Sequence, residues 1–261
     1  MLVSKLVNEN DFKSDWFKNS CLKLHEPFQY HRKLWEFCYI YQGLLERGLL
    51  RPNKEGLGFG VGKEPLAAAF ASHGCVITAT DLDLENAKQL GWIETNQHCN
   101  KLADLNERKI CNPEEFEKLV TFEYQNMNSI SEKYTNKFDF TWSSCAFEHC
   151  GSLELGKQFI INQMKCLKPG GVAIHTTEFN LSSNDKTLDN LILALFRKTD
   201  IEWIVQHLRK LGHHIEIDYS IGTGQLESYI DTPPYTNIPH IRLQLDEYTS
   251  TSIGLIIHKK E

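Results

Sequence analysis

The stretch EGLGFGVGKEPL, residues 55–66, decides the fold. It begins as a short apolar segment, typical of a buried strand, and continues with glycines at positions 58, 60 and 62. Glycine allows positive φ angles and lets a ligand approach the backbone closely. Pro65 suits the first turn of a helix, and the free amide groups at such a helix end attract anions. The pattern predicts a strand, a ligand-binding glycine loop and then a helix.

The spacing of the glycines distinguishes this loop from two other nucleotide-binding loops. The dinucleotide motif GxGxxG, started at Gly58, requires a glycine at position 63, where the chain has Lys63. A phosphate-binding P-loop is excluded because no Gly-Lys pair is followed by Ser or Thr. NAD-dependent oxidoreduction is therefore disfavoured.

Asp81 follows the loop and ends the next predicted strand, residues 75–80. A carboxylate at this position can accept hydrogen bonds from both hydroxyl groups of a ribose. The alternative is that Asp81 only caps the following helix, although Asp83 could fill that role. We expect Asp81 to bind ribose.

Strand and helix patterns alternate through residues 55–220, which predicts a doubly wound α/β sheet, mostly parallel, with helices on both faces. The last two predicted strands are joined by a proline-bearing loop without a helix, which indicates an antiparallel hairpin at the C-terminal edge. Seven strands are expected, at residues 55–60, 75–80, 121–124, 138–143, 172–176, 214–219 and 251–258. Helices are expected at residues 30–48, 66–72, 84–91, 113–120, 155–167, 187–196 and 200–211. Residues 1–50 are predicted to be a helical extension that caps the active site of a main domain, residues 51–261.

Composition and charge restrict the partners. The 261 residues carry a formal net charge of −6, whereas non-specific binding of nucleic acid usually needs a basic face, so we expect no nucleic-acid partner. No apolar window is long enough for a membrane span, and the eight cysteines are scattered without a CxxC pair, as in reduced thiols. These features predict a cytoplasmic protein without a metal site. Zinc at Cys145, His149 and Cys150 is disfavoured because a second ligand pair is missing.

Taken together, the motifs resemble those of the class I S-adenosylmethionine-dependent methyltransferases. The glycine loop looks like the family's first motif, GxGxG, and Asp81 looks like its second-strand acid. Asn126 and Met127 stand where the family holds adenine, and FEH, residues 147–149, is similar to the Glu-His pair after its fourth strand. LKPGG, residues 167–171, before the fifth predicted strand of the parallel series is the most specific match.

The resemblance covers about residues 50–258 and implies a Rossmann-like fold that binds S-adenosyl-L-methionine. The chain departs from the family at Gly56, where the usual residue is Glu or Asp, and at Asn126, where many members have Asp. The amide oxygen of Asn126 can still accept a hydrogen bond from the adenine amino group. The cofactor-binding residues implied by the resemblance are Gly58, Phe59, Gly60, Gly62, Asp81, Leu82, Asn126, Met127 and Ser144.

The ends of the fourth and fifth strands supply the candidate catalytic residues, because ligands in such sheets bind outside the carboxyl ends of the strands. Methyl transfer to a hydroxyl group is helped by a general base. The candidates are His149, since a histidine can act as a base near neutral pH, together with His175 and Glu178. Three alternatives stay open: a structural or cofactor-binding role for the Glu-His pair, a solvated turn at residues 175–180, and a divalent cation held by His175 and Glu178.

We expect O-methylation of a small polar acceptor, with a sugar or glycan precursor as the leading candidate. The polar segment 175–180 and the acidic chain favour this acceptor. WEFC, residues 35–38, and the glycine loop are similar to segments of bacterial methyltransferases from cell-surface polysaccharide pathways. Residues 31–36 and 229–240 are expected to shape the acceptor site.

Two other functions remain possible. One is N-methylation of a small molecule or protein, although a motif like Asn-Pro-Pro-Tyr is missing after the fourth strand, where Ser143-Ser144-Cys145-Ala146 stands. The other is a non-catalytic cofactor-binding module, since Gly56 replaces the usual acid.

Overall fold

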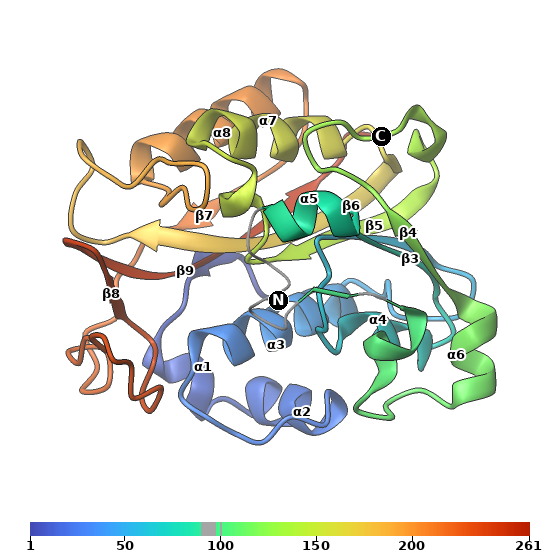
Figure 1. Ribbon diagram of the computed structural model, residues 1–261, viewed down its shortest axis with the longest axis horizontal. Coiled ribbons are helices and arrows are strands. Elements are labelled where there is room, and N and C mark those ends of the chain that lie inside the picture. The colour runs from blue at the N-terminus through green and yellow to red at the C-terminus, as the bar shows by residue number, and fades with distance from the viewer. Residues whose placement is uncertain (90–97, 100) are drawn as a thin grey trace.

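The computed structural model describes residues 1–89, 98–99 and 101–261, and it is built around one mixed sheet (Figure 1). The strand order is β4-β3-β2-β5-β6-β9-β1-β7, and β8 pairs with β9 off this path. The strands are β1 (Ser4–Leu6), β2 (Glu55–Phe59), β3 (Val76–Asp81), β4 (Val120–Tyr124), β5 (Phe138–Ser144), β6 (Leu167–Asn180), β7 (Ile217–Asp218), β8 (Leu243–Leu245) and β9 (Tyr248–His258). Strands β2 to β6 pair in parallel, and β9 is antiparallel to β6. The predicted parallel sheet with an antiparallel C-terminal edge is therefore confirmed.

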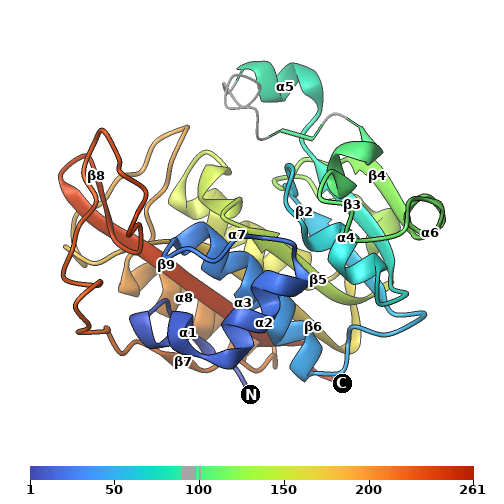
Figure 2. The ribbon, with the colours of Figure 1, turned by 90° about the horizontal axis from the view of Figure 1, so that it is seen from below.

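Helices cover both faces of the sheet (Figures 1 and 2). α7 (Leu153–Gln163) and α8 (Lys198–Lys210) pack on one face. The opposite face carries α1 (Glu9–Lys13), α2 (Asp15–Lys23), α3 (Arg32–Glu46), α4 (Leu66–Ala71) and α6 (Pro113–Leu119). α5 (Leu84–Gln89) follows β3 and stands apart from these layers in Figure 2. None of the described helices is both long and apolar enough to cross a membrane.

The C-terminal edge is more complex than the predicted hairpin. β1, from the start of the chain, lies between β9 and β7, antiparallel to β9 and parallel to β7. The strand predicted at 214–219 therefore meets the last strand only through an isolated bridge between His214 and His258. The true hairpin partner of β9 is the short strand β8.

Residues 187–196, predicted as a helix, form an irregular loop instead. The side-chain oxygen of Asn190 accepts hydrogen bonds from the backbone N–H groups of Ile192 and Leu193, at 2.9 and 3.0 Å. Such local bonds satisfy the backbone without a helical turn, which is why Asn often disrupts a helix. The helix predicted at residues 187–196 is therefore wrong.

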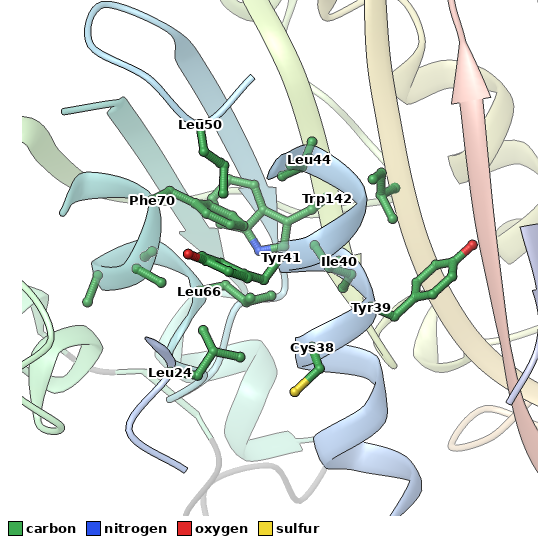
Figure 3. Packing of buried hydrophobic residues seen from close by; sticks show 14 of the residues in the cluster. Leu24, Cys38, Tyr39, Ile40, Tyr41, Leu44, Leu50, Leu66, Phe70 and Trp142 are labelled. Atoms are coloured by element: carbon green, nitrogen blue, oxygen red, sulfur yellow. The ribbon is translucent and has the colours of Figure 1, made fainter. Parts of the chain in front are cut away.

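α3 joins the N-terminal segment to the rest of the core. Its side chains Trp35, Cys38 and Tyr39 are fully buried, and Figure 3 places the helix against Phe70 and Trp142. On β9, a Cβ at Gly254 would lie only 2.2 Å from the Tyr39 ring, so glycine is needed for this close approach. The boundary predicted at residue 50 falls between α3 and β2, and both sides of it share one hydrophobic core.

We predict that Gly56→Ala lowers the free energy of unfolding by about 1–3 kcal/mol, because it overpacks the core. A Cβ at Gly56 would lie 2.4 Å from the Phe140 ring, so the acid that the resemblance leads one to expect here does not fit without rearrangement. The measurement is urea unfolding of this variant, of Phe140→Leu and of the double variant. Phe140→Leu should recover part of the loss in the double variant, and purely additive losses would contradict the packing argument.

Candidate functional site

A cavity of about 580 Å³ lies at the carboxyl ends of β2, β3, β4 and β5. This is the edge at which parallel α/β sheets bind ligands, and the volume is typical of small-molecule sites. α3 closes one side with Lys33 and Phe37. Seven of the nine predicted cofactor residues line the cavity: Gly60, Gly62, Asp81, Leu82, Asn126, Met127 and Ser144.

The glycine loop forms one wall of the cavity. Gly60 and Gly62 have φ angles of 57° and 50°, in the left-handed region that favours glycine. A Cβ at Gly60 would lie 2.9 Å from Ala146 in the segment after β5. The backbone is thus exposed to the cavity without a side chain in front of it.

Asp81 organises this wall. Its carboxylate accepts hydrogen bonds from the backbone N–H groups of Gly62 at 3.1 Å, Leu82 at 2.8 Å and Cys99 at 3.3 Å. The capping of α5 is done by Asp83, whose side chain accepts from the N–H of Asn86 at 3.1 Å. Helix capping therefore does not explain Asp81, whose carboxylate faces the cavity.

Gly58 and Phe59, both predicted to bind the cofactor, do not line the cavity but belong to β2. A Cβ at Gly58 would lie 2.3 Å from the Trp142 ring. Phe59 is fully buried and packs edge-on against Phe159 under α7. These two residues support the glycine loop from behind, and contact with a ligand begins at Gly60.

Asn126 and Met127 line the cavity after β4, as predicted. The side-chain oxygen of Asn126 already accepts the N–H of Asn128 at 2.8 Å. A carbonyl oxygen has a second lone pair, so it can still accept a hydrogen bond from a ligand. The neighbouring Gln125 holds the segment in place by accepting the N–H of Ser131 at 3.2 Å.

His149 is the one predicted catalytic residue that lines the cavity. It belongs to η3 (Phe147–His149), and its Nδ1 lies 2.6 Å from the carbonyl oxygen of Ile192. Because a carbonyl only accepts, Nδ1 carries the proton. The loop 187–196 thereby orients the ring of His149.

His175 is fully buried on the α7 side of the sheet and does not line the cavity. Its Nδ1 lies 2.8 Å from the hydroxyl of Ser143, and its ring packs against Phe147 and Phe159. Burial lowers the pKa of His175 to about 3. The structure therefore gives His175 a packing role. The alternative of a cation shared with Glu178 also fails, because residues three apart in a strand point to opposite faces.

Glu178, the third predicted catalytic residue, is buried behind the cavity wall. It forms an ion pair with Arg32 of α3, whose guanidinium also lies 3.2 Å from the Cys145 sulfur. Cys145, Glu148 and Glu178 are the only described His, Cys, Asp or Glu side chains that approach one another as metal ligands would, within 4.8 Å. The guanidinium of Arg32 already supplies a positive charge to this group. The group differs from Cys145, His149 and Cys150, the residues considered as zinc ligands in the sequence.

Three charged residues of the site were not among the predicted site residues. Glu64 lines the cavity directly after the glycine loop. Glu148 does not line it, but its fully buried side chain directly precedes the lining residue His149 in η3. Lys33 was only grouped with the acceptor region 31–36, yet it lines the same cavity as the glycine loop. The sequence did offer one signal that Glu64 belongs to the site, because Glu64 lies between the glycine loop and Pro65 within residues 55–66.

No protein-family model and no curated protein matches the chain. Among solved structures it is similar to phosphoethanolamine N-methyltransferase 2 from Haemonchus contortus in complex with S-adenosyl-L-methionine, with 16% identity and a TM-score of 0.50. That alignment covers 85% of this chain and 53% of the other, so the chain spans about half of that enzyme. The YcgJ protein from Bacillus subtilis matches with 14% identity, a TM-score of 0.50, and 85% and 99% of the two chains covered.

The chain has the class I methyltransferase fold. Identities this low establish the fold alone, and a fold does not by itself determine a reaction. A further structure with the same fold is the cyclase SpnF, at 14% identity and a TM-score of 0.52, with 85% of this chain and 81% of that chain covered. The reaction of this methyltransferase-fold protein must therefore be argued from its site.

We predict that acid destabilises the protein partly through His175. Its pKa is about 3 in the folded state and about 6.5 when unfolded, so the unfolded state binds the proton first. The contribution of His175 to stability is complete above about pH 6.5 and is lost as the pH falls, by at most about 1.4 kcal/mol per unit. His175→Gln, which can still bond Ser143, should flatten the fall in unfolding free energy between pH 7 and 4. Equal slopes for both proteins would contradict a neutral buried imidazole.

Proposed function

We propose that the protein transfers the methyl group of S-adenosyl-L-methionine to a hydroxyl group of a small polar acceptor, with sugars and glycans as the leading class. The observation that carries the proposal is the joint placement of the glycine loop and Asp81 on one cavity, in a chain with the methyltransferase fold. A cytoplasmic location and a place in cell-surface polysaccharide pathways are parts of the same proposal.

The residues that line the cavity suit this cofactor chemically. The Asp81 carboxylate has roughly four lone-pair sites, and three of them accept backbone N–H groups. One site remains for a ribose hydroxyl. Gly60 presents bare backbone where a Cβ would collide with Ala146. Asn126 and Met127 offer an amide and an apolar surface for adenine. When bound, the cofactor supplies a methyl group activated by a sulfonium charge.

The acceptor subsite is proposed at the ends of β5 and β6, next to Cys145 on the cavity wall. Three buried atoms in this region have no hydrogen-bond partner among the described residues: Arg32 Nε, Glu148 Oε1 and Glu178 Oε2. One of them donates and two accept, and leaving such groups unpaired is costly. A hydroxyl group both donates and accepts, so a polyol satisfies this mixture better than an amine, which only donates when protonated.

Two side chains are suited to receive the proton of the acceptor hydroxyl. His149 lines the cavity with its ring orientation set by Ile192. Burial raises the pKa of Glu148, whose other oxygen accepts a hydrogen bond from Thr177 at 2.9 Å, and a carboxylate of raised pKa is a better base. We retain His149 as the candidate base and place Glu178 with Arg32 in acceptor orientation.

The alternatives are methyl transfer to nitrogen and cofactor binding without turnover. One neighbour of the same fold is named as an N-methyltransferase, which keeps the first alternative relevant. The second is less favoured because the place of the missing acid at position 56 is filled by the Phe140 ring, while the glycine loop itself keeps its left-handed glycines.

Cofactor binding is tested by calorimetric titration with S-adenosylhomocysteine. We expect micromolar affinity for the wild type and a loss of ten- to a hundredfold for Asp81→Ala, because a hydrogen bond to a charged group is worth about 1.5–3 kcal/mol. Asp83→Ala is the matched control, since Asp83 caps α5 and does not line the cavity. NAD should not bind. Equal losses in both variants, or binding of NAD instead, would argue against the proposed site.

The acceptor is tested by measuring S-adenosylhomocysteine formation over panels of sugars, polyols and amines. We expect turnover with hydroxyl acceptors, and Glu178→Gln should lower kcat/KM by at least tenfold while leaving cofactor affinity unchanged, because Glu178 does not line the cofactor cavity. Melting temperatures control for the loss of the Arg32 ion pair. Turnover confined to amines would favour the alternative reaction, and binding without any turnover would favour a non-catalytic module.

A further inference from the structure

Glu64 is a buried carboxyl group that faces the cavity. It stands between the glycine loop and α4, is only 5% exposed and lines the cavity. One oxygen accepts a hydrogen bond from the indole N–H of Trp142 at 2.5 Å. The other oxygen has no hydrogen-bond partner among the described residues. A desolvated carboxyl with one open acceptor is poised for a donor from the cavity.

Lys33 supplies the opposite charge on the same cavity. Its ammonium, in the first turn of α3, forms no ion pair within 4.0 Å with a described carboxylate. Another cation of the lining, Arg108, is already committed to Glu26 at 2.5 Å and to the carbonyl oxygen of Lys63 at 2.8 Å. Cys145, Glu36 and Glu148 raise the pKa of Lys33 against the effect of its burial, so it is charged at neutral pH.

An open carboxyl and an uncommitted ammonium on one cavity are complementary to a zwitterion. An α-amino acid presents an ammonium for Glu64 and a carboxylate for Lys33. Charge-assisted hydrogen bonds of this kind are about twice as strong as neutral ones. The proposed cofactor carries one such group, at the end opposite to adenine.

The protonation of Glu64 links this contact to pH. Burial raises the pKa of Glu64 to about 8, and Asp81 on β3 acts in the same direction. The Trp142 indole, Lys33 on α3 and Arg108 after η1 (Leu102–Asn106) act in the opposite direction. Before a ligand binds, Glu64 is therefore mostly a neutral carboxylic acid at pH 7. An ammonium placed against it stabilises the carboxylate and expels the proton to solvent.

We propose that Glu64 and Lys33 bind the amino-acid end of the cofactor, and that Glu64 releases one proton when the cofactor ammonium binds. The inference rests on the proposed function and adds to it a pH-dependent step in cofactor recognition. Below about pH 8, affinity rises with pH by up to about tenfold per unit, because the released proton is a product of binding.

The experiment compares two ligands that differ only in the amino-acid end. S-adenosylhomocysteine carries it, and 5′-methylthioadenosine lacks it. Each is titrated calorimetrically at pH 7 in phosphate and in Tris, whose different ionisation enthalpies report the protons released. We expect about 0.9 proton for the first ligand, since a group of pKa about 8 is about nine-tenths protonated at pH 7, and none for the second.

Variants assign the effect to residues. Glu64→Gln keeps an acceptor for Trp142 but should abolish proton release and weaken S-adenosylhomocysteine at least tenfold at pH 8, with 5′-methylthioadenosine unchanged. Lys33→Met should weaken the first ligand only. Glu55→Gln is the matched control, because Glu55 begins β2 at the far end from the cavity and pairs with Lys168. Melting temperatures verify that each variant is folded.

The outcomes separate this inference from the function on which it rests. Equal proton release for both ligands, or equal weakening of both by Glu64→Gln, overturns the roles of Glu64 and Lys33 while leaving the cofactor in place. If neither ligand binds the folded wild type, the cofactor itself is wrong. Selective, proton-linked binding of S-adenosylhomocysteine that is lost in Glu64→Gln supports the inference.

Discussion

The buried carboxylate of Glu36 is the constraint on which the site depends. It is wholly inaccessible to solvent, yet it ties α3 to the adjacent strands β5, β6 and β9 by accepting hydrogen bonds from the hydroxyl groups of Ser144, Thr176 and Ser252. Burial alone would raise the pKa of Glu36, but Lys33, Arg32 and the hydrogen bonds from Ser252 and Cys145 lower it, so it stays ionised. Because Arg32 and Lys33 precede Glu36 by four and three residues, they share its helix face. Anchoring this one carboxylate therefore places Lys33 on the cavity and holds Arg32 against Glu178 behind the cavity wall.

Much of the sheet could be predicted because parallel strands buried on both faces are apolar runs separated by helices. Local sequence could not predict β1, since three residues carry too little pattern. The strand predicted at 214–219 contains β7, but its pairing with β1, which joins Ser4 to Ile217, could not be predicted. The helix expected at 187–196 failed for a local reason, because the side chain of Asn190 bonds to the backbone that a helix would have used. The conformation of short strands and of loops capped by side chains depends on their hydrogen-bonding partners, which the periodicity of apolar residues does not reveal.

Some residues of the candidate site could likewise be predicted from the sequence, and others could not. Gly60, Gly62 and Asp81 could be predicted because they belong to one strand–loop–helix unit with a characteristic spacing. Lys33 could not, since it reaches the same cavity from α3, which is distant in the sequence from the glycine loop. Glu64 stands beside the loop in the sequence, but only the structure shows that it lines the cavity together with Lys33. His175 and Glu178 looked equivalent as polar residues at the end of one strand. The alternation of side chains in β6 separates them, with His175 under α7 and Glu178 against Arg32.

The position of β1 has a consequence for how the chain is made. Residues 4–6 are synthesised more than two hundred residues before Ile217 and Gly254, with which β1 pairs. During translation the parallel half of the sheet can form while β1 still has no neighbours on either side. Contacts so distant in the sequence form slowly, because a long loop must close before they contribute any stability. β1 is thus among the last strands to reach its place, and until then the edge of β9 is open to pairing with other chains.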